Sequence, residues 1–408
     1  MRAVPVSDGI WWVGGVDWNL RDFHGYETPR GTTYNAYLVM GKDKIALIDT
    51  VKTPFVPEML SRIAEVVDPS KIDLIVVNHV EPDHNSGLRL VMAACPSARV
   101  VASKAGVPSV AEYHDGLVVD PVGPEDVIDL GGKTLQFMPM PMVHWPDSMF
   151  TYCAESATLM PNDAFGQHVA SAERFADEVG LDLAVEELGI YYANILMPLS
   201  KMVGKAIDKV VEAGWKLDVI APSHGVIWRG EGIDRAIAAY RKWTANTLKD
   251  KAIVAYATMW ESTDALAKAI ADGIIAEGVD ASLYDLSVTP VATVTADLLE
   301  ARALVVGSPT LHHGMLYRVA GYLHWLAALK PAGRLGATFG SFGWGGGATK
   351  QITEKLEDMG FVMCAEPFTE KFRPTTEDLA AAHEWGRGIA RAVKAAGAPS
   401  ADAPSGDA

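Results

Sequence analysis

Positions 76–87 of the sequence read VVNHVEPDHNSG and follow an apolar run that predicts a buried strand. Four side chains that commonly bind metals fall within six positions of this segment: His79, Glu81, Asp83 and His84. In an extended loop alternate side chains point the same way, so His79, Glu81 and Asp83 can converge. Because Asp and Glu are rarely buried unless they are paired or coordinated, the cluster predicts a metal site.

Three later candidate ligands each stand in a loop that follows an apolar strand: His144, Asp163 and His224. Each is weak evidence alone, because single histidines are usually structural. Together with the first loop they predict a site built from imidazoles and carboxylates. Such a ligand set suits non-haem iron better than a thiolate set would, although zinc stays open.

Length and composition indicate two or three globular domains. The chain has 408 residues, of which 49% are hydrophobic and 21% charged, so each domain can bury a full core. A net charge of −16 without any Lys/Arg-rich run argues against nucleic acid and anionic membranes as partners. It suits solubility, or else a basic partner.

The sequence shows neither a membrane-spanning stretch nor a secretory signal, and this bears on the cellular compartment. No stretch reaches the roughly 20 apolar residues that span a bilayer, and the first residues lack the apolar core of a secretory signal. The three cysteines, Cys95, Cys153 and Cys364, lie far apart and form no CxxC pair, which disfavours a disulfide framework and a fused rubredoxin-type module. We therefore expect a cytoplasmic protein.

The pattern of elements changes near position 250. Before it, short β runs and a few helices, including one over 173–187, predict stacked, mostly antiparallel sheets flanked by helices. From 251 on, strands and amphipathic helices alternate, which predicts a doubly wound parallel sheet. We predict domains over 1–249 and 250–395, and a disordered tail over 396–408.

The second domain begins with a strand and a hydroxyl-rich loop, VAYATMWESTD at 254–264. Backbone N–H groups at a helix N-terminus bind phosphate, and hydroxyls add donors. A similar loop could cap any helix, but this one follows the first strand of a βα array, where a flavodoxin-like fold binds the phosphate of FMN. The loops at 307–314 and 340–347 offer small residues and an aromatic face to the flavin ring. The predicted FMN contacts are Thr258, Met259, Trp260, Ser262, Thr263, Ser308, Pro309, Thr310, Leu311, Ser341, Phe342, Gly343, Trp344 and Gly345.

The metal loop resembles that of the metallo-β-lactamase superfamily, which usually reads HxHxDH and precedes later His, Asp and His ligands. Glu81 stands where the hydrolases have a histidine, and this departure marks the flavodiiron family, also called A-type flavoproteins. The segments 17–26 and 31–37 are similar to the N-terminal signature of that family, and the second domain is similar to its flavodoxin-like half. The resemblance implies an α/β multi-domain protein, with a metallo-β-lactamase-like αββα sandwich followed by a flavodoxin-like doubly wound parallel sheet.

The resemblance also implies the cofactors, two iron ions and one FMN. By it, one iron is bound by His79, Glu81 and His144, the other by Asp83 and His224, and Asp163 bridges them. His84 is either a further ligand or a neighbour that orients the ligands.

Around this centre, His24 and Tyr26 are candidates to line the gas pocket or to donate hydrogen bonds, with aromatic packing in a turn as the alternative. Tyr191 and Tyr192 are weaker candidates for the same pocket.

The activity implied is reduction of O2 to water, of NO to N2O, or both, with the preferred gas left open. A reduced flavin and two ferrous ions together hold the four electrons that O2 requires. The chain has no GxGxxG fingerprint at the expected place, so electrons should come from a separate carrier such as rubredoxin. The family's head-to-tail homodimer is expected, with a homotetramer as the further possibility.

Three alternatives stay open. The first is a zinc hydrolase of the glyoxalase II or β-lactamase type, which Glu81 and the second domain disfavour. The others are an electron carrier in which only the flavodoxin-like half acts, and a gas sensor that turns over slowly.

Overall fold

The computed structural model of the chain describes residues 2–398. The chain forms two compact units, Met1–Thr244 and Ala245–Ala408, and each has its own hydrophobic core. Among the described residues, no helix combines the length and the apolar character needed to cross a bilayer.

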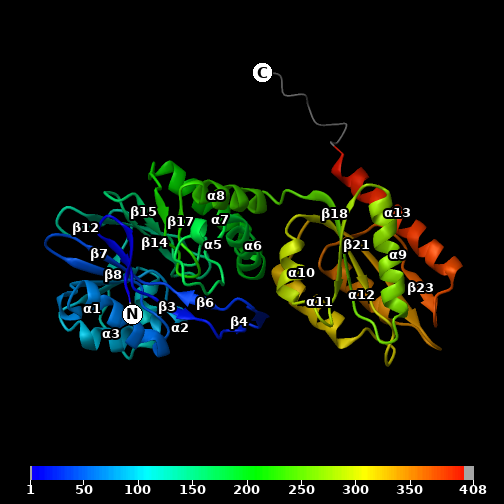
Figure 1. The fold of residues 1–408 in the computed structure, drawn as a ribbon, viewed down its shortest axis with the longest axis horizontal. Coiled ribbons are helices and arrows are strands. Elements are labelled where there is room, and N and C mark those ends of the chain that lie inside the picture. Colours follow the sequence, from blue (N-terminus) through cyan, green and yellow to red (C-terminus); the bar gives the residue numbers. More distant parts are fainter. Residues whose placement is uncertain (1, 399–408) are drawn as a thin grey trace, which may run out of the picture. The chain divides into compact units, whose positions relative to one another are not determined.

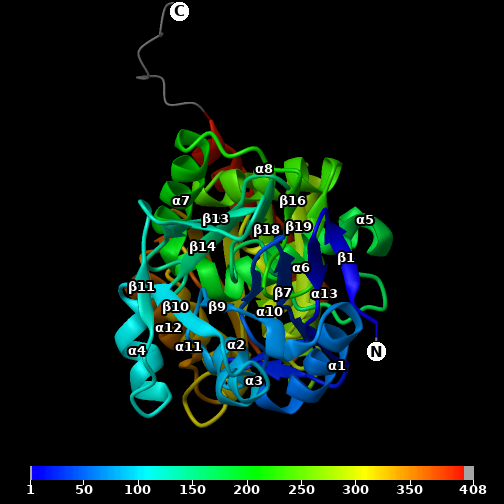
Figure 2. The same cartoon turned by 90° about the vertical axis from the view of Figure 1, so that its left-hand side faces the viewer.

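The first unit contains two stacked sheets (Figure 2). The strands of one are, in spatial order, β1 (Val4–Ser7), β2 (Ile10–Trp12), β7 (Tyr37–Met40), β8 (Ile45–Ile48), β9 (Leu74–Val77), β10 (Arg99–Ser103) and β11 (Asp120–Val122). Those of the other are β12 (Val127–Asp129), β13 (Thr134–Pro139), β14 (Met149–Cys153), β15 (Thr158–Met160), β16 (Val219–Ile220) and β17 (Trp228–Arg229). Two short ribbons pair β3 (Gly15–Asp17) with β6 (Thr32–Tyr34), and β4 (Asp22–Phe23) with β5 (Tyr26–Glu27).

Helices and short helical turns flank these sheets. They are α1 (Val56–Val66), α2 (Pro82–Asn85), α3 (Leu88–Ala94), α4 (Gly106–Tyr113), α5 (Ala176–Val179), α6 (Leu181–Tyr191), α7 (Ser200–Glu212) and α8 (Glu231–Thr244), with short turns η1 (Thr53–Phe55), η2 (Pro69–Lys71), η3 (Tyr192–Leu196) and η4 (Met197–Leu199). The helix predicted over 173–187 is wrong in its bounds. Gly180, at φ 110°, separates α5 from α6, because that backbone conformation lies outside the helical region.

Hydrophobic side chains pack on both faces of the first sheet. Side chains such as Trp12, Val39, Phe137 and Met149 meet between the sheets, while α1, α3 and α4 pack on the outer face of the first sheet. The central strands are buried along almost their whole length, as β9 and β14 are, because both faces of each sheet are covered. The predicted αββα sandwich is confirmed.

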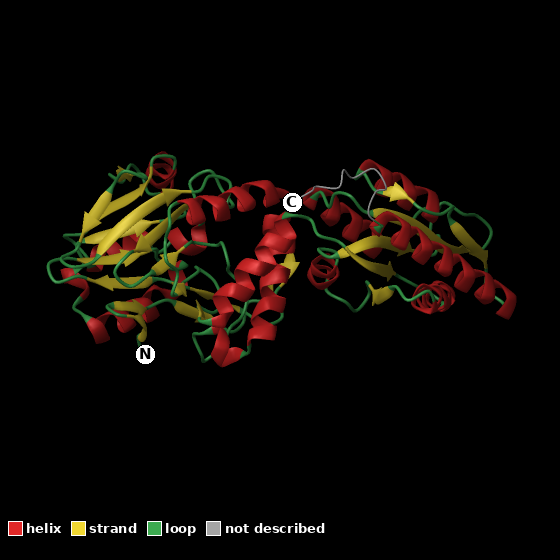
Figure 3. Cartoon of the chain, turned by 90° about the horizontal axis from the view of Figure 1, so that it is seen from above, coloured by secondary structure: helices red, strands yellow, loops and turns green. Residues whose placement is uncertain are grey.

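The second unit is a single parallel sheet with helices on both faces (Figures 1 and 3). Its strands run in the order β19 (Asp280–Asp285), β18 (Lys249–Tyr256), β20 (Ala301–Gly307), β21 (Leu335–Phe342) and β22 (Val362–Met363), and β23 (Phe368–Lys371) also pairs with β21. The helices are α9 (Ser262–Ala276), α10 (Val291–Asp297), α11 (Tyr317–Leu329), α12 (Ala348–Asp358) and α13 (Thr376–Gly397). α9 and α13 share one face, and α10, α11 and α12 the other. This order is the flavodoxin-like doubly wound one, as predicted.

α9 and α13 pack closely through glycine. A Cβ built on Gly273 would lie 2.0 Å from the backbone oxygen of His383, and one on Gly386 would lie 2.3 Å from that of Ile270. Side chains at these positions would force the helices apart. α13 runs to Gly397, so the predicted tail over 396–408 begins inside a helix, and its remainder from 399 on lies outside the described residues.

Candidate functional site

The predicted metal ligands stand in loops that follow strands or at the short helix α2. His79 follows β9, His144 lies in the loop between β13 and β14, Asp163 follows β15 and His224 follows β16. Glu81 precedes α2, and Asp83 and His84 belong to it. Strands of both sheets therefore deliver side chains to one place, as strand ends do in α/β folds.

The side chains form two adjoining clusters. The first contains His79, Glu81, His144 and Asp163, and the second contains Asp83, His84 and His224. All of these residues are buried.

Asp163 faces both clusters, one with each carboxylate oxygen. Its Oδ2 lies 3.0 Å from His144 Nε2 and 3.6 Å from His79 Nε2. Its Oδ1 lies 3.0 Å from His84 Nε2 and 3.6 Å from His224 Nε2. This is the placement expected of a carboxylate that bridges two metal ions.

Besides Asp163, each cluster has one carboxylate of its own, Glu81 in the first and Asp83 in the second. Glu81 Oε2 lies 3.2 Å from both His79 Nε2 and His144 Nε2, and Asp83 Oδ2 lies 3.0 Å from His224 Nε2. His84 Nε2 points into the second cluster, 3.4 Å from Asp83 Oδ2.

The residues present fit two metal ions. Within the described part of the chain, both carboxylate oxygens of Asp83, Oδ1 of Asp163 and both ring nitrogens of His84 are buried without a hydrogen bond of normal geometry. Buried polar atoms almost always have a partner. Metal coordination is the partner that suits oxygen and nitrogen donors collected from four loops.

Hydrogen-bond partners fix which ring nitrogen of His79 and of His224 is available to a metal ion. His79 Nδ1 lies 2.9 Å from Asp147 Oδ2, and His224 Nδ1 lies 2.7 Å from the carbonyl oxygen of Thr33. Carboxylate and carbonyl oxygens accept hydrogen bonds, so each Nδ1 carries the proton and each Nε2 keeps a lone pair for a metal. Asp147 also accepts from the backbone N–H of Val80, at 2.8 Å.

A second buried carboxylate holds the start of the metal loop. Asp49, at the end of β8, accepts from the backbone N–H of Asn78 at 2.7 Å and from its side-chain amide at 3.1 Å. Thr151 in β14 donates to the other side of that amide, at 2.7 Å. Burial raises the pKa of Asp49 to about 6.

The carboxylates of the centre raise the pKa values of His79 and His144. Burial alone would lower the pKa of His79, but hydrogen bonds with Asp147 and Glu81 raise it to about 9. The same balance, with Asp163 and Glu81 as partners, raises the pKa of His144 to about 10. A coordinating imidazole gives up this extra proton, so metal binding must displace protons.

The predicted pocket residues lie beside the clusters. His24 Nε2 is 2.6 Å from Glu81 Oε1, and its side chain is 40% exposed. Tyr26 is fully buried, and burial together with the charges of Asp163, Glu187 and Glu81 raises its pKa well above 10. The phenol of Tyr26 therefore stays protonated.

The two weaker pocket candidates, Tyr191 and Tyr192, lie in different surroundings. Tyr191 packs against the centre, with its ring 6.1 Å from that of His224. Tyr192 turns instead toward α7, where its hydroxyl bonds Ser200 Oγ at 2.8 Å.

The sequence analysis did not identify one further histidine, His168, which packs beside the second cluster. The ring of His168 lies 5.1 Å from that of His224, and its Nδ1 lies 2.9 Å from Thr32 Oγ1. Burial and the charge of His224 lower its pKa well below 6.5, so it stays neutral. The segment around it carries no spacing signal that could have identified it.

The second unit has a pocket of about 800 Å³ at the carboxyl ends of its central strands, a size typical of cofactor sites. All the predicted FMN contacts line it except Thr263 and Ser308. The Oγ1 of Thr263 lies 2.9 Å from Ser341 Oγ, and Ser308 Oγ accepts from the backbone N–H of Leu316 at 2.9 Å. These two hydroxyls shape the loops instead of facing the pocket.

The flavin pocket fits its predicted ligand. The hydroxyl of Thr258, within the described residues, is buried without a hydrogen-bond partner, as expected of a phosphate donor. Gly340 lets the loop approach closely, because a Cβ there would lie 2.3 Å from the backbone oxygen of Ser308. The lining residues that sequence reasoning left out are His312, His313, Phe372 and Arg373.

Comparisons with known proteins agree with both sites. Residues 32–225 match the family model described as ODP family beta lactamase, and residues 254–386 match the flavodoxin model. The nitric oxide reductase of Moorella thermoacetica is 44% identical over 397 residues, which cover 96% of this chain and 99% of that protein. The solved rubredoxin oxygen:oxidoreductase from Desulfovibrio gigas superposes with a TM-score of 0.92 at 38% identity, covering 98% of this chain and 100% of that one. The flavodiiron protein from Giardia intestinalis gives a TM-score of 0.92 at 33% identity, over 97% and 98% of the two chains.

The chain belongs to the flavodiiron family. As a flavodiiron protein it is an oxidoreductase, and its cofactors are FMN and a non-haem diiron centre. The predicted family, fold class and cofactors are thereby confirmed.

Proposed function

We propose that this flavodiiron protein reduces O2 to water, NO to N2O, or both, at the two clusters around Asp163. The placement of the two Asp163 oxygens, one toward each cluster, is the observation that carries the proposal. In it, His79, Glu81 and His144 hold one iron, and Asp83 and His224 hold the other. When bound, the iron pair and the flavin supply the electrons for gas reduction.

We assign His84 as a further ligand of the second iron. Its Nε2 lies within 3.4 Å of the nearest carboxylate oxygens of both Asp83 and Asp163. A residue that merely oriented its neighbours would direct this nitrogen elsewhere.

His24 and Tyr26 are the proposed proton donors. Burial lowers the pKa of His24, but its hydrogen bond with Glu81 outweighs this and raises it. Because the side chain is also partly exposed, His24 can take a proton from water and hold it at Nε2 beside the centre. Tyr26 keeps a protonated hydroxyl in the buried layer and can donate a hydrogen bond there.

Electrons are proposed to come from rubredoxin or a similar small carrier, and the reaction is proposed to take place in the cytoplasm. The cysteines support the compartment, because Cys95, Cys153 and Cys364 are all free thiols, as is usual in a reducing environment.

A head-to-tail homodimer is proposed as the working form. Trp260 and Trp344 line the flavin pocket and are 87% and 95% exposed, and exposed aromatic groups of this kind mark contact surfaces. Trp344→Glu should shift the protein to a monomer, measured by light scattering. A dimer that withstands this change would count against the role of this surface. Assembly into a homotetramer stays a prediction.

The decisive experiment measures iron, zinc and FMN per chain, and then follows O2 and NO consumption after anaerobic reduction. We expect two irons and one FMN, with turnover of at least one gas. His79→Ala and Asp163→Ala should abolish turnover and leave the flavin absorbance intact. The matched control Asp208→Asn, at an exposed ion pair with Arg241, should change neither.

Other outcomes would select the alternatives. Stoichiometric zinc without flavin would indicate a hydrolase. Two irons and one FMN without gas turnover would indicate a sensor or an electron carrier.

A further inference from the structure

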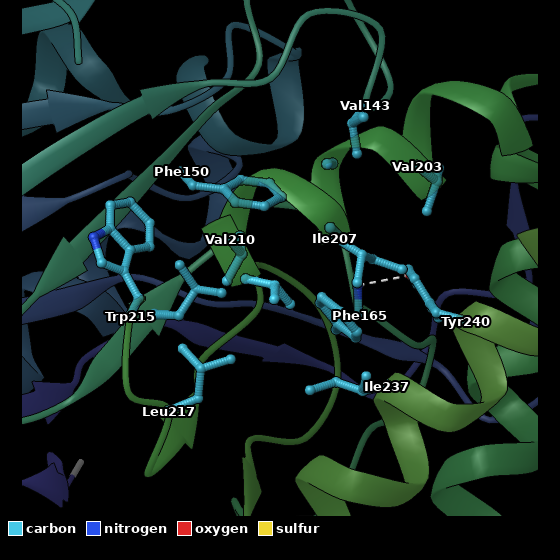
Figure 4. A pocket seen from close by; sticks show the side chains of 14 residues that line it. Val143, Phe150, Phe165, Val203, Ile207, Val210, Trp215, Leu217, Ile237 and Tyr240 are labelled. Carbon is cyan, nitrogen blue, oxygen red and sulfur yellow. Dashed lines mark hydrogen bonds between the residues drawn. The ribbon is translucent and has the colours of Figure 1, made fainter. Parts of the chain in front are cut away.

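An apolar cavity of about 80 Å³ lies in the first unit, between the second sheet and helices α7 and α8 (Figure 4). Phe150 of β14 and Leu159 of β15 form its floor, and Ala206, Ile207 and Ile237 of the helices close it from the other side. This space is separate from the flavin pocket.

The cavity borders the loops that carry two proposed metal ligands. Val143, which directly precedes His144, forms part of the wall. Ala164 and Phe165, which directly follow Asp163, form another part. On two sides, therefore, a residue in the cavity wall is the direct chain neighbour of a proposed metal ligand.

The polar atoms in the walls already have partners. Tyr240 Oη accepts a hydrogen bond from the backbone N–H of Phe165 at 2.7 Å, drawn as the dashed line in Figure 4. Trp215 Nε1 donates to Gln136 Oε1 at 3.1 Å. A cavity without free polar groups gives water little to bind, and such spaces stay dry and take up apolar guests such as xenon.

The cavity extends from near the surface toward the centre. Val211, at the end of α7, is 63% exposed, whereas Val143 is 1% exposed. In Figure 4, Trp215 and Leu217 lie at one end of the cavity and Val143 at the other. A small molecule that enters beside the end of α7 would thus reach the loops of the metal ligands.

We propose that this cavity binds the small apolar gas, O2 or NO, that the diiron centre consumes, and stores it beside the metal loops. The inference rests on the proposed function, because only a gas-reducing centre needs such a store. An uncharged diatomic molecule leaves water readily for an apolar space, whereas charged or strongly hydrated substrates do not. The cavity therefore selects for gas and raises its concentration near Val143.

The first experiment locates the guest without turnover. Crystals of the holoprotein are pressurised with xenon, and the anomalous signal is mapped. We expect a xenon atom among Phe150, Ile207 and Ile237. Ala206→Leu, which fills the space, should remove that site, while the control Ala213→Leu, the same change at the exposed C-cap of α7, should retain it.

The second experiment measures the steady-state kinetics of gas consumption. Filling the cavity with Ala206→Leu should raise the KM for the gas several-fold and leave kcat at saturating gas unchanged, because a store acts before chemistry. Ala213→Leu should leave both constants unchanged. Should Ala206→Leu not fold, Ile207→Ala supplies the test in the other direction, since it enlarges the cavity and should raise xenon occupancy without raising KM.

Either of two results would overturn the inference: a wild-type crystal without xenon in the cavity, or a folded Ala206→Leu protein that loses xenon and keeps its KM. Failure of the proposed function looks different, because that protein would bind xenon and consume neither gas.

Discussion

Removing the carboxylate of Asp147 should weaken metal binding without touching a proposed ligand. Asp147 is 4% exposed and accepts two hydrogen bonds through the same oxygen, from His79 Nδ1 and from the backbone N–H of Val80. It therefore fixes both the ring of His79 and the backbone of the metal loop. Neighbours of this kind typically contribute about 10- to 100-fold to metal affinity.

The two simplest variants should differ in a graded way. Asp147→Asn keeps an oxygen for both donors but loses the charge, and a charge-assisted hydrogen bond exceeds a neutral one by about 1 to 1.5 kcal/mol. We expect roughly tenfold weaker iron binding, since about 1.4 kcal/mol is a factor of ten. Asp147→Ala leaves two buried donors unpaired and frees the His79 ring, so about a 100-fold loss is expected.

The assay is anaerobic competition for Fe²⁺ between the apoprotein and a chelator of known affinity. Thermal unfolding of each apoprotein separates loss of the site from loss of the fold. Asp208→Asn makes the same chemical change on the surface and should bind iron as the wild type does. The reasoning fails if Asp147→Ala, while folded, keeps wild-type affinity, or if the Asn variant loses more than the Ala variant.

Four further predictions follow from other contacts. Loading the apoprotein with Fe²⁺ should release protons, because the pKa values of three site histidines are raised to about 9 or 10. The affinity of the protein for Fe²⁺ should therefore fall as the pH drops below about 9. Calorimetry in two buffers measures the released protons, and an affinity that does not change with pH would contradict this prediction. Burial raises the pKa of Glu187 from its ordinary 4.5 to about 7. Between these pH values the folded state holds a proton that the unfolded state has lost, so the free energy of unfolding should fall as the pH rises. Glu187→Gln should reduce the dependence of Tm on pH in this range, and an unchanged dependence would refute the assignment. Thr258→Val should weaken FMN binding about tenfold, as expected for losing one donor to a charged phosphate, whereas the exposed Thr369→Val should not, measured by fluorescence titration. Gly273→Ala should destabilise the second unit by about 1 to 3 kcal/mol through overpacking against α13, seen as a lower Tm for flavin release; an unchanged Tm would show that the helices can separate freely.

The sequence predicted those parts of the site that depend on position within an element. His79 and Asp163 each stand two or three positions after an apolar strand, and a side chain there has few places to go other than the edge of the sheet. The order of strands and helices after position 250 likewise determines a parallel sheet, because each helix must cross over it. These inferences need no knowledge of distant contacts.

The parts that were missed depend on partners far away in the chain. Asp147 acts on His79 across 68 positions, and no local spacing reveals that pairing. Thr263 bonds Ser341, which is 78 positions away, so local sequence does not show where its hydroxyl points. Ser308 accepts instead from Leu316 within its own loop, a contact that depends on how that loop folds. The apolar cavity is equally invisible, because Phe150 and Ile237 are ordinary core residues until the helices are in place.

The distribution of the ligands over four separate loops also has a consequence for folding order. His79 follows β9 of the first sheet and His224 follows β16 of the second, so the centre closes only after both sheets have formed and the long intervening chain has been ordered. Contacts so distant in sequence form slowly. We therefore expect the newly made chain to acquire iron late, as an already compact apoprotein, with the metal locking an assembled fold instead of nucleating it.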